Sequence, residues 1–110
     1  MRHFTIDQLA KQERQKIIDY LKKKAQSGPI DDLFWLPLPT QLLAASQNDH
    51  PQCAPFFLAI EVEEERVSFE LLVRSQSTLH CPCIAYANPA QREYLLHFID
   101  AMVEQLQLKA

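Results

Sequence analysis

Apolar residues recur at helical spacing near the start of the chain, between Thr5 and Gly28. Thr5 and Gln8 have the spacing of a capping box, and Gly28 followed by Pro29 is a stop signal. The stripe between these signals consists of Ile6, Leu9, Ala10, Ile17, Ile18, Leu21 and Ala25. The pattern therefore predicts an amphipathic helix over residues 5–27.

A second stripe with helical spacing lies near the end of the chain. Asn88, Pro89 and Gln91 form a typical start signal, because asparagine caps a helix and proline is tolerated in its first turn. The stripe that follows consists of Leu95, Phe98, Ile99, Met102, Val103 and Leu106. We predict a helix over residues 89–107.

Between the two helices the apolar period changes to two. Residues 56–62 alternate in polarity, and so do residues 67–74, which is typical of half-buried strands. A third strand is expected over residues 79–86, at an edge because Pro82 has no N–H to donate. The sheet predicted over residues 56–86 is thus a short antiparallel meander.

Residues 29–55 are rich in proline, which disfavours a long helix or a central strand and predicts an irregular, wrapped connection. A short helix fits residues 40–47. The apolar residues Phe34, Trp35 and Leu36 allow two interpretations. They cover the core, or they form an exposed surface that binds a partner.

Together these elements predict one α+β domain over residues 1–110. The expected order is helix, short helix or loop, three strands, helix. N-terminal and C-terminal amphipathic helices are expected to pack on a sheet of about three strands. At this length a core can support the fold without metal or disulfide bonds, so a metal is permitted but not required.

Composition and charge narrow the functional classes. Hydrophobic residues make up 47% of the chain and charged residues 23%, which is typical of a globular domain. The sequence lacks a signal-peptide pattern and any apolar run long enough for a membrane helix, so we expect a soluble, cytoplasmic protein with reduced thiols. The N-terminal segment is basic, but no aromatic residues interleave with its lysine run, so nucleic-acid binding is not favoured.

The strongest candidate for chemistry is the set His50, Cys53, Cys81 and Cys83. Three thiolates and an imidazole suit a tetrahedral zinc site of the Cys₃His type. The spacing argues against it, because Cys81 and Cys83 are separated by one residue and are expected on a strand. Residues two apart on a strand share a face, so the pattern favours small core thiols over a metal site. Redox chemistry of the thiols is a third, weaker interpretation.

Other chemistry has weaker support. A single glycine excludes the glycine-rich phosphate loops, and the run Glu63–Glu64–Glu65 is best interpreted as a solvated hairpin tip. Three hypotheses remain. The first is a non-catalytic interaction domain that binds a protein partner or itself, without a cofactor. The second is a small zinc protein, and the third, weaker one is an enzyme that uses a cysteine or histidine.

Overall fold

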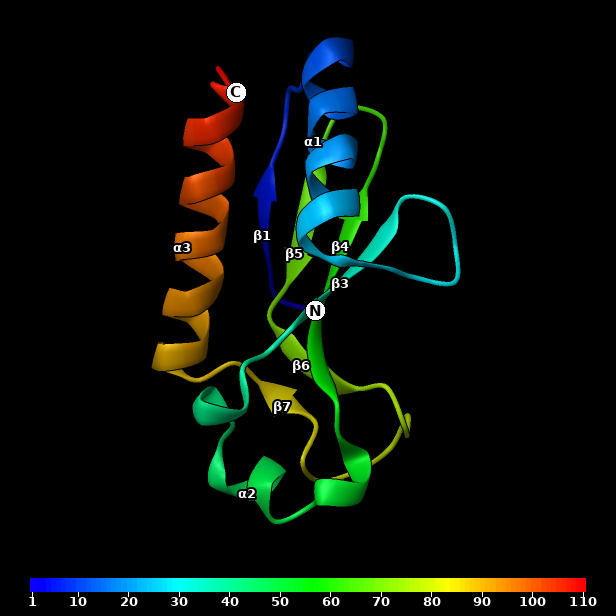
Figure 1. The fold of residues 1–110 in the computed structure, drawn as a ribbon, viewed down its shortest axis with the longest axis vertical. Coiled ribbons are helices and arrows are strands. Elements are labelled where there is room, and N and C mark those ends of the chain that lie inside the picture. The colour runs from blue at the N-terminus through cyan, green and yellow to red at the C-terminus, as the bar shows by residue number, and fades with distance from the viewer.

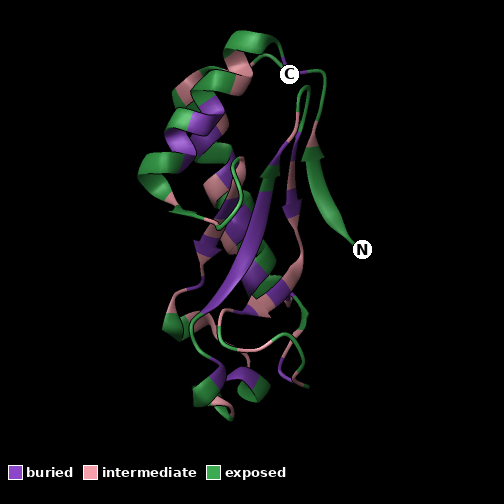
Figure 2. Ribbon diagram, turned by 90° about the vertical axis from the view of Figure 1, so that its right-hand side faces the viewer, coloured by how far each residue is buried: buried purple, intermediate pink, exposed green.

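The longest alternating run becomes the central strand of the fold. The computed structural model describes all 110 residues and places β4 at Phe56–Val62, with its even-numbered side chains in the core. Figure 2 shows this strand buried along nearly its whole length. The C-terminal half of β4 pairs with β5 (Val67–Glu70), and its N-terminal half pairs with β6 (Leu72–Ser75).

Four more strands complete an antiparallel sheet of seven. They are β1 (His3–Ile6), β2 (Gln26–Ser27), β3 (Leu33–Pro37) and β7 (Ala85–Tyr86). The main order is β1-β5-β4-β3-β2, and β6 joins β4 to β7 (Figure 1). The α+β class agrees with the sequence analysis, but the expected three-stranded sheet and its order are wrong.

The N-terminal segment differs most clearly from its prediction. Residues 3–6 form β1 rather than the start of a helix, because Phe4 and Ile6 lie opposite Phe69 and Val67 and share their face. Gln8 has a positive φ of 55°, which separates the strand from the helix. Helix α1 spans Lys11–Lys24, and the chain then turns into β2.

The sequence analysis predicted an irregular connection for the proline-rich segment, but this segment contains a strand of the sheet. Residues 33–36 hold no proline and alternate in burial, so β3 pairs along its whole length with β4. Three short helical pieces follow, namely the 3₁₀ turn η1 (Thr40–Leu42), helix α2 (Ala45–Asn48) and the 3₁₀ turn η2 (Pro51–Cys53).

The expected third strand of the meander is also mostly absent. Only Ala85–Tyr86 is strand, and residues 81–84 form a turn closed by a 3.0 Å hydrogen bond from the Ile84 N–H to the Cys81 carbonyl. Pro82 explains the turn, because its fixed φ suits the second position of a β-turn and it cannot donate to a neighbouring strand.

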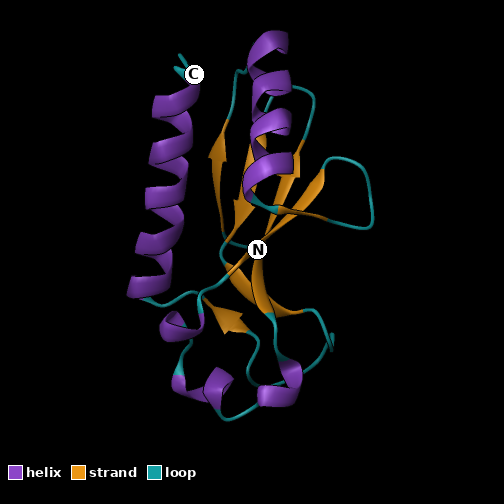
Figure 3. Ribbon diagram, in the orientation of Figure 1, coloured by secondary structure: helices purple, strands orange, loops and turns teal.

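The two long helices cover one face of the sheet. Helix α3 spans Pro89–Leu106 and begins with reciprocal bonds between Asn88 and Gln91, as the sequence predicts. Tyr20 of α1 and Phe98 of α3 meet edge to face at 5.9 Å. Neither helix is both long enough and apolar enough to cross a membrane. The molecule is 42 Å long, and α2 with its neighbouring loops gathers at the end opposite the C-terminus (Figure 3).

Candidate metal centre

Three cysteines from two distant segments meet beside α2. Cys53 ends η2, whereas Cys81 and Cys83 are the first and third residues of the turn before β7. The argument from the sequence against a shared metal site assumed that Cys81 and Cys83 lie on a regular strand. Because these residues lie on a turn, their side chains converge instead of lining the core in parallel.

The distances between the sulfur atoms are short. Cys81 Sγ lies 2.6 Å from Cys83 Sγ and 3.5 Å from Cys53 Sγ. The Cys83 N–H also donates to Cys81 Sγ, at 3.4 Å. All three thiols are free, and Cys81 is the sulfur that the other two share.

His50 is the fourth residue of the candidate set from the sequence analysis. The ligand atoms of His50, Cys81 and Cys83 all lie within 4.8 Å of one another, and Cys53 adjoins this group through Cys81. His50 Nδ1 lies 2.6 Å from the carbonyl oxygen of Ser46, so Nδ1 carries the proton that it donates there. With Nδ1 engaged in this way, Nε2 is the nitrogen left to bind a metal, and a backbone carbonyl that fixes the tautomer is typical of metal-binding histidines.

Buried polar side chains hold the two cysteine segments in place. The Ser75 hydroxyl donates to the carbonyl of Cys53, and Gln47 Nε2 donates to the carbonyl of Cys83 at 3.5 Å. Gln91 Nε2 in turn donates to Gln47 Oε1 at 3.0 Å, which links the site to the start of α3. Sequence reasoning missed Ser75 and Gln47, because isolated Ser and Gln residues carry no motif. Gln91 was assigned only its capping role.

The thiols differ in exposure and in acidity. Cys83 and Cys53 are buried, with 0% and 4% of their surface exposed, whereas Cys81 is partly exposed. Burial, followed by the bond to Cys81, raises the pKa of Cys83 to about 12, and burial raises the pKa of Cys53. The thiol and N–H of Cys83 both donate to Cys81, and they lower the pKa of Cys81.

The predicted binding segment Phe34, Trp35 and Leu36 does not form one surface. Phe34 and Leu36 point into the core from β3, with 3% and 2% of their surface exposed. Trp35 points to the opposite face, where its ring stacks on Phe57 at 4.6 Å. The two rings help to line a surface pocket of about 210 Å³.

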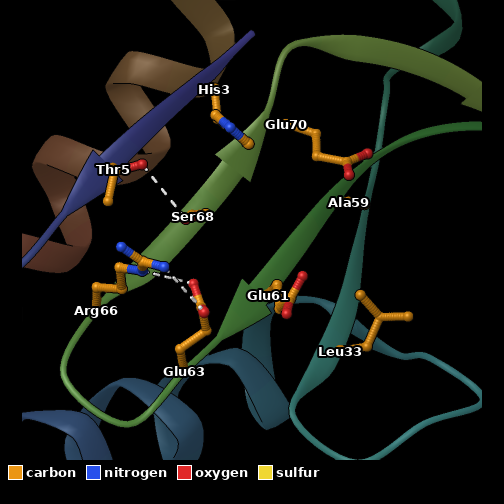
Figure 4. A pocket seen from close by; sticks show the side chains of 9 residues that line it. All are labelled: His3, Thr5, Leu33, Ala59, Glu61, Glu63, Arg66, Ser68 and Glu70. Atoms are coloured by element: carbon orange, nitrogen blue, oxygen red, sulfur yellow. Dashed lines mark hydrogen bonds and ion pairs between the residues drawn. The ribbon is translucent and has the colours of Figure 1, made fainter. Parts of the chain in front are cut away.

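The face of the sheet opposite the helices carries a second pocket, of about 250 Å³ (Figure 4). Glu61, Glu63 and Glu70 are its acidic residues. Arg66 binds Glu63 and thereby lowers its pKa, and Arg74 binds Glu70 at 2.8 Å. Two of the three carboxylates are thus already paired with arginines, which leaves Glu61 without an ion pair.

Neither of the two pockets described above is lined by His50 or by a cysteine. Comparison of the chain with protein-family models, with curated proteins and with solved structures gave no match. The arrangement of His50 and the three thiols is therefore the basis for a functional interpretation.

Proposed function

We propose that this protein binds zinc through His50, Cys53, Cys81 and Cys83. The observation that carries the proposal is the convergence of His50, Cys81 and Cys83, whose ligand atoms lie within 4.8 Å of one another. Cys53, 28 residues before Cys81, adds a third sulfur 3.5 Å from that of Cys81. Burial alone would suit thiols that only pack in the core, as the sequence analysis allowed. Packing does not require three sulfur atoms to meet at one point.

The donor set selects the metal. Thiolate and imidazole ligands favour zinc over magnesium or calcium, which prefer oxygen. Four protein ligands fill a tetrahedral site and give zinc a structural role. Two sulfurs on one zinc stand about 3.8 Å apart, given bonds of about 2.3 Å. Cys81 and Cys83 therefore separate by about 1 Å on binding, and the partly exposed Cys81 side chain has the freedom to move.

The proposed metal joins parts of the chain that contain little regular structure. η2 and the turn before β7 are held to each other by the bonds of Ser75 and by the contact of Cys53 with Cys81. A zinc ion bound by ligands from both segments adds a direct link between them. Because such a site forms only when both segments are in place, its binding energy stabilises this end of the fold.

Zinc affinity in a pair of histidine variants tests the proposal. Native mass spectrometry of the wild type is expected to show one zinc ion per chain, which a strong chelator removes. The variant His50→Ala should bind zinc at least about tenfold more weakly in competition with a chromogenic chelator, because it loses a ligand.

The matched control is His80→Ala, which removes an exposed imidazole one residue away from Cys81. Its affinity should equal that of the wild type. A wild type that takes up no zinc from buffered solution contradicts the proposal, and so does an equal loss of affinity in both variants.

A second candidate function is a non-catalytic interaction domain, favoured by the half-buried Trp35, which stacks on the buried Phe57 on the face of the sheet opposite the helices. Leu79 lies beside Trp35 and Phe57 in the same pocket and is 83% exposed. Aromatic residues are enriched at protein interfaces. If this face binds a second copy, light scattering should give a mass above that of the monomer, and Trp35→Ala should lower it. The control Leu96→Ala, on α3, should not, and a monomeric wild type at high concentration contradicts self-association.

A further inference from the structure

We propose that Cys81 and Cys83 form a reversible disulfide bond, with Cys81 as the thiol that an oxidant attacks and Cys83 as the thiol that resolves the product. The oxidant is a hydroperoxide, and the disulfide itself needs no metal. Release of zinc when the disulfide forms is an additional inference that rests on the proposed function. The site would thus be a thiol switch that responds to hydroperoxides.

The geometry of the turn carries the proposal. Cys81 Sγ and Cys83 Sγ are 2.6 Å apart, and a disulfide bond is about 2.05 Å long. The two sulfurs therefore lie within reach of a bond, whose formation brings the Cβ–S–S–Cβ dihedral to about 90°. Because Pro82 favours the turn, the two thiols stay close to each other in the reduced protein.

The exposure of the two thiols indicates which one the oxidant attacks and which one resolves the product. Cys81 is the one partly exposed thiol of the three, so a dissolved oxidant reaches its sulfur first. Cys83 is fully buried, so a dissolved oxidant does not reach it before Cys81. An accessible thiol next to a resolving thiol is the usual arrangement in redox-sensitive sites.

The chemical steps balance with one hydroperoxide. Cys81 sulfur attacks the outer oxygen and breaks the O–O bond, which gives a sulfenic acid and releases the alcohol, or water in the case of hydrogen peroxide. Cys83 sulfur then attacks Cys81 sulfur, the S–S bond forms, and the hydroxyl leaves as water with the proton of Cys83. Two sulfurs lose one electron each, and the peroxide gains two.

Cys53 is the competing partner, since its sulfur lies 3.5 Å from that of Cys81. A bond between them would need the sulfurs to approach by more than about 1 Å and would pull η2 toward the turn. The Ser75 hydroxyl holds the backbone of Cys53 against such a movement. Cys83 therefore forms the bond in preference to Cys53.

Oxidation and zinc binding exclude each other at this site. A disulfide removes two of the four proposed ligands, and the remaining Cys53 and His50 hold zinc weakly. Each disulfide formed should therefore release one zinc ion from the loaded protein. A reductant should restore both thiols and the capacity to bind zinc again.

Peptide mapping after treatment with hydrogen peroxide tests the inference on the full-length, metal-free protein. Trypsin cuts after Lys24, Arg66, Arg74 and Arg92, so Cys81 and Cys83 lie together on peptide 75–92 and Cys53 lies on peptide 25–66. The expected product is peptide 75–92 with a mass lower by two hydrogen atoms and with no thiol that can be alkylated. Cys53 should still be alkylated. Dithiothreitol should reverse the change.

A cross-link between peptides 25–66 and 75–92 overturns the inference, and so does full alkylation of all three thiols after peroxide. The variant Cys53→Ser is the control and should form the same disulfide as the wild type. In a parallel experiment, peroxide added to zinc-loaded protein should release zinc to a chromogenic chelator in step with the disulfide. If the protein never binds zinc, the proposed function fails, but the mapping still decides whether the disulfide forms.

Discussion

Ser75 is the residue whose contribution to the site is easiest to isolate. Its buried hydroxyl donates to the carbonyl of Cys53 and accepts the N–H groups of Ser77 and Thr78, at 3.0 and 3.2 Å. One side chain thus connects the segment that carries Cys53 to the loop that leads to Cys81. Loss of this hydroxyl leaves a buried carbonyl without its partner.

We expect Ser75→Ala to lower the free energy of unfolding by about 1–3 kcal/mol, the usual effect of leaving a buried polar group unsatisfied. It should also weaken zinc binding, because Cys53 is held less firmly. Urea denaturation measures the first effect. The control is Ser77→Ala, an exposed serine in the same loop whose hydroxyl donates to the Ala54 carbonyl at 2.9 Å. Because water replaces this exposed bond, a change below about 0.5 kcal/mol is expected. Equal losses in the two variants would show that Ser75 has no special role.

At the scale of single residues, the sequence indicates the candidate ligands better than the residues that hold those ligands in place. Cysteine and histidine are rare enough in a chain of 110 residues for their grouping to be noticed, so all four proposed ligands were identifiable. Ser75 and Gln47 acquire their roles only from the tertiary contacts around them. No local pattern in the sequence indicates such contacts.

At the scale of elements, the N-terminal strand β1 shows how tertiary pairing overrides a local helix signal. The Leu71 N–H donates to the carbonyl of Arg2 at 3.0 Å. The backbone N–H and C=O groups of residues 2, 4 and 6 therefore point toward β5 and form hydrogen bonds with it. In an antiparallel pair the intervening residues direct their backbone groups away from the partner. The amides of His3 and Thr5 therefore face outward at the edge of the sheet.

Amide hydrogen exchange should reveal this alternation. We expect slow exchange at Phe4 and Ile6 and fast exchange at Thr5, because only the first two amides donate to β5. NMR resolves the three amides separately. Uniform exchange across residues 3–6 would instead indicate that the segment is a frayed helix start, as its capping pattern suggested.

The other elements differ in how much the sequence determined them. Alternation located β4, and a cap with a long apolar stripe located α3. β3 was missed because the prolines around it argued against a strand, although none lies within residues 33–36. The strand expected at residues 79–86 is mostly absent, because the turn preference of Pro82 outweighs a short alternating pattern.

For the whole molecule, one hydrophobic core extends from the long helices and the central strands to the segments that carry the cysteines. Helix α1 lies toward the end marked by the C-terminus in Figure 1. α2 and the segments beside it lie at the other end (Figure 1), and these segments carry His50 and the three cysteines. Cys53 and Cys83 also belong to the hydrophobic core, so the proposed metal would fix this end directly to the sheet.

X-ray absorption spectroscopy at the zinc edge, on protein loaded with one zinc ion per chain, tests the central claim most directly. The account predicts three sulfur neighbours at about 2.3 Å and one nitrogen at about 2.0 Å. In His50→Ala the nitrogen of imidazole should disappear while the three sulfurs remain. A shell of oxygen and nitrogen atoms without sulfur would contradict the account, because zinc would then lie away from the three thiols.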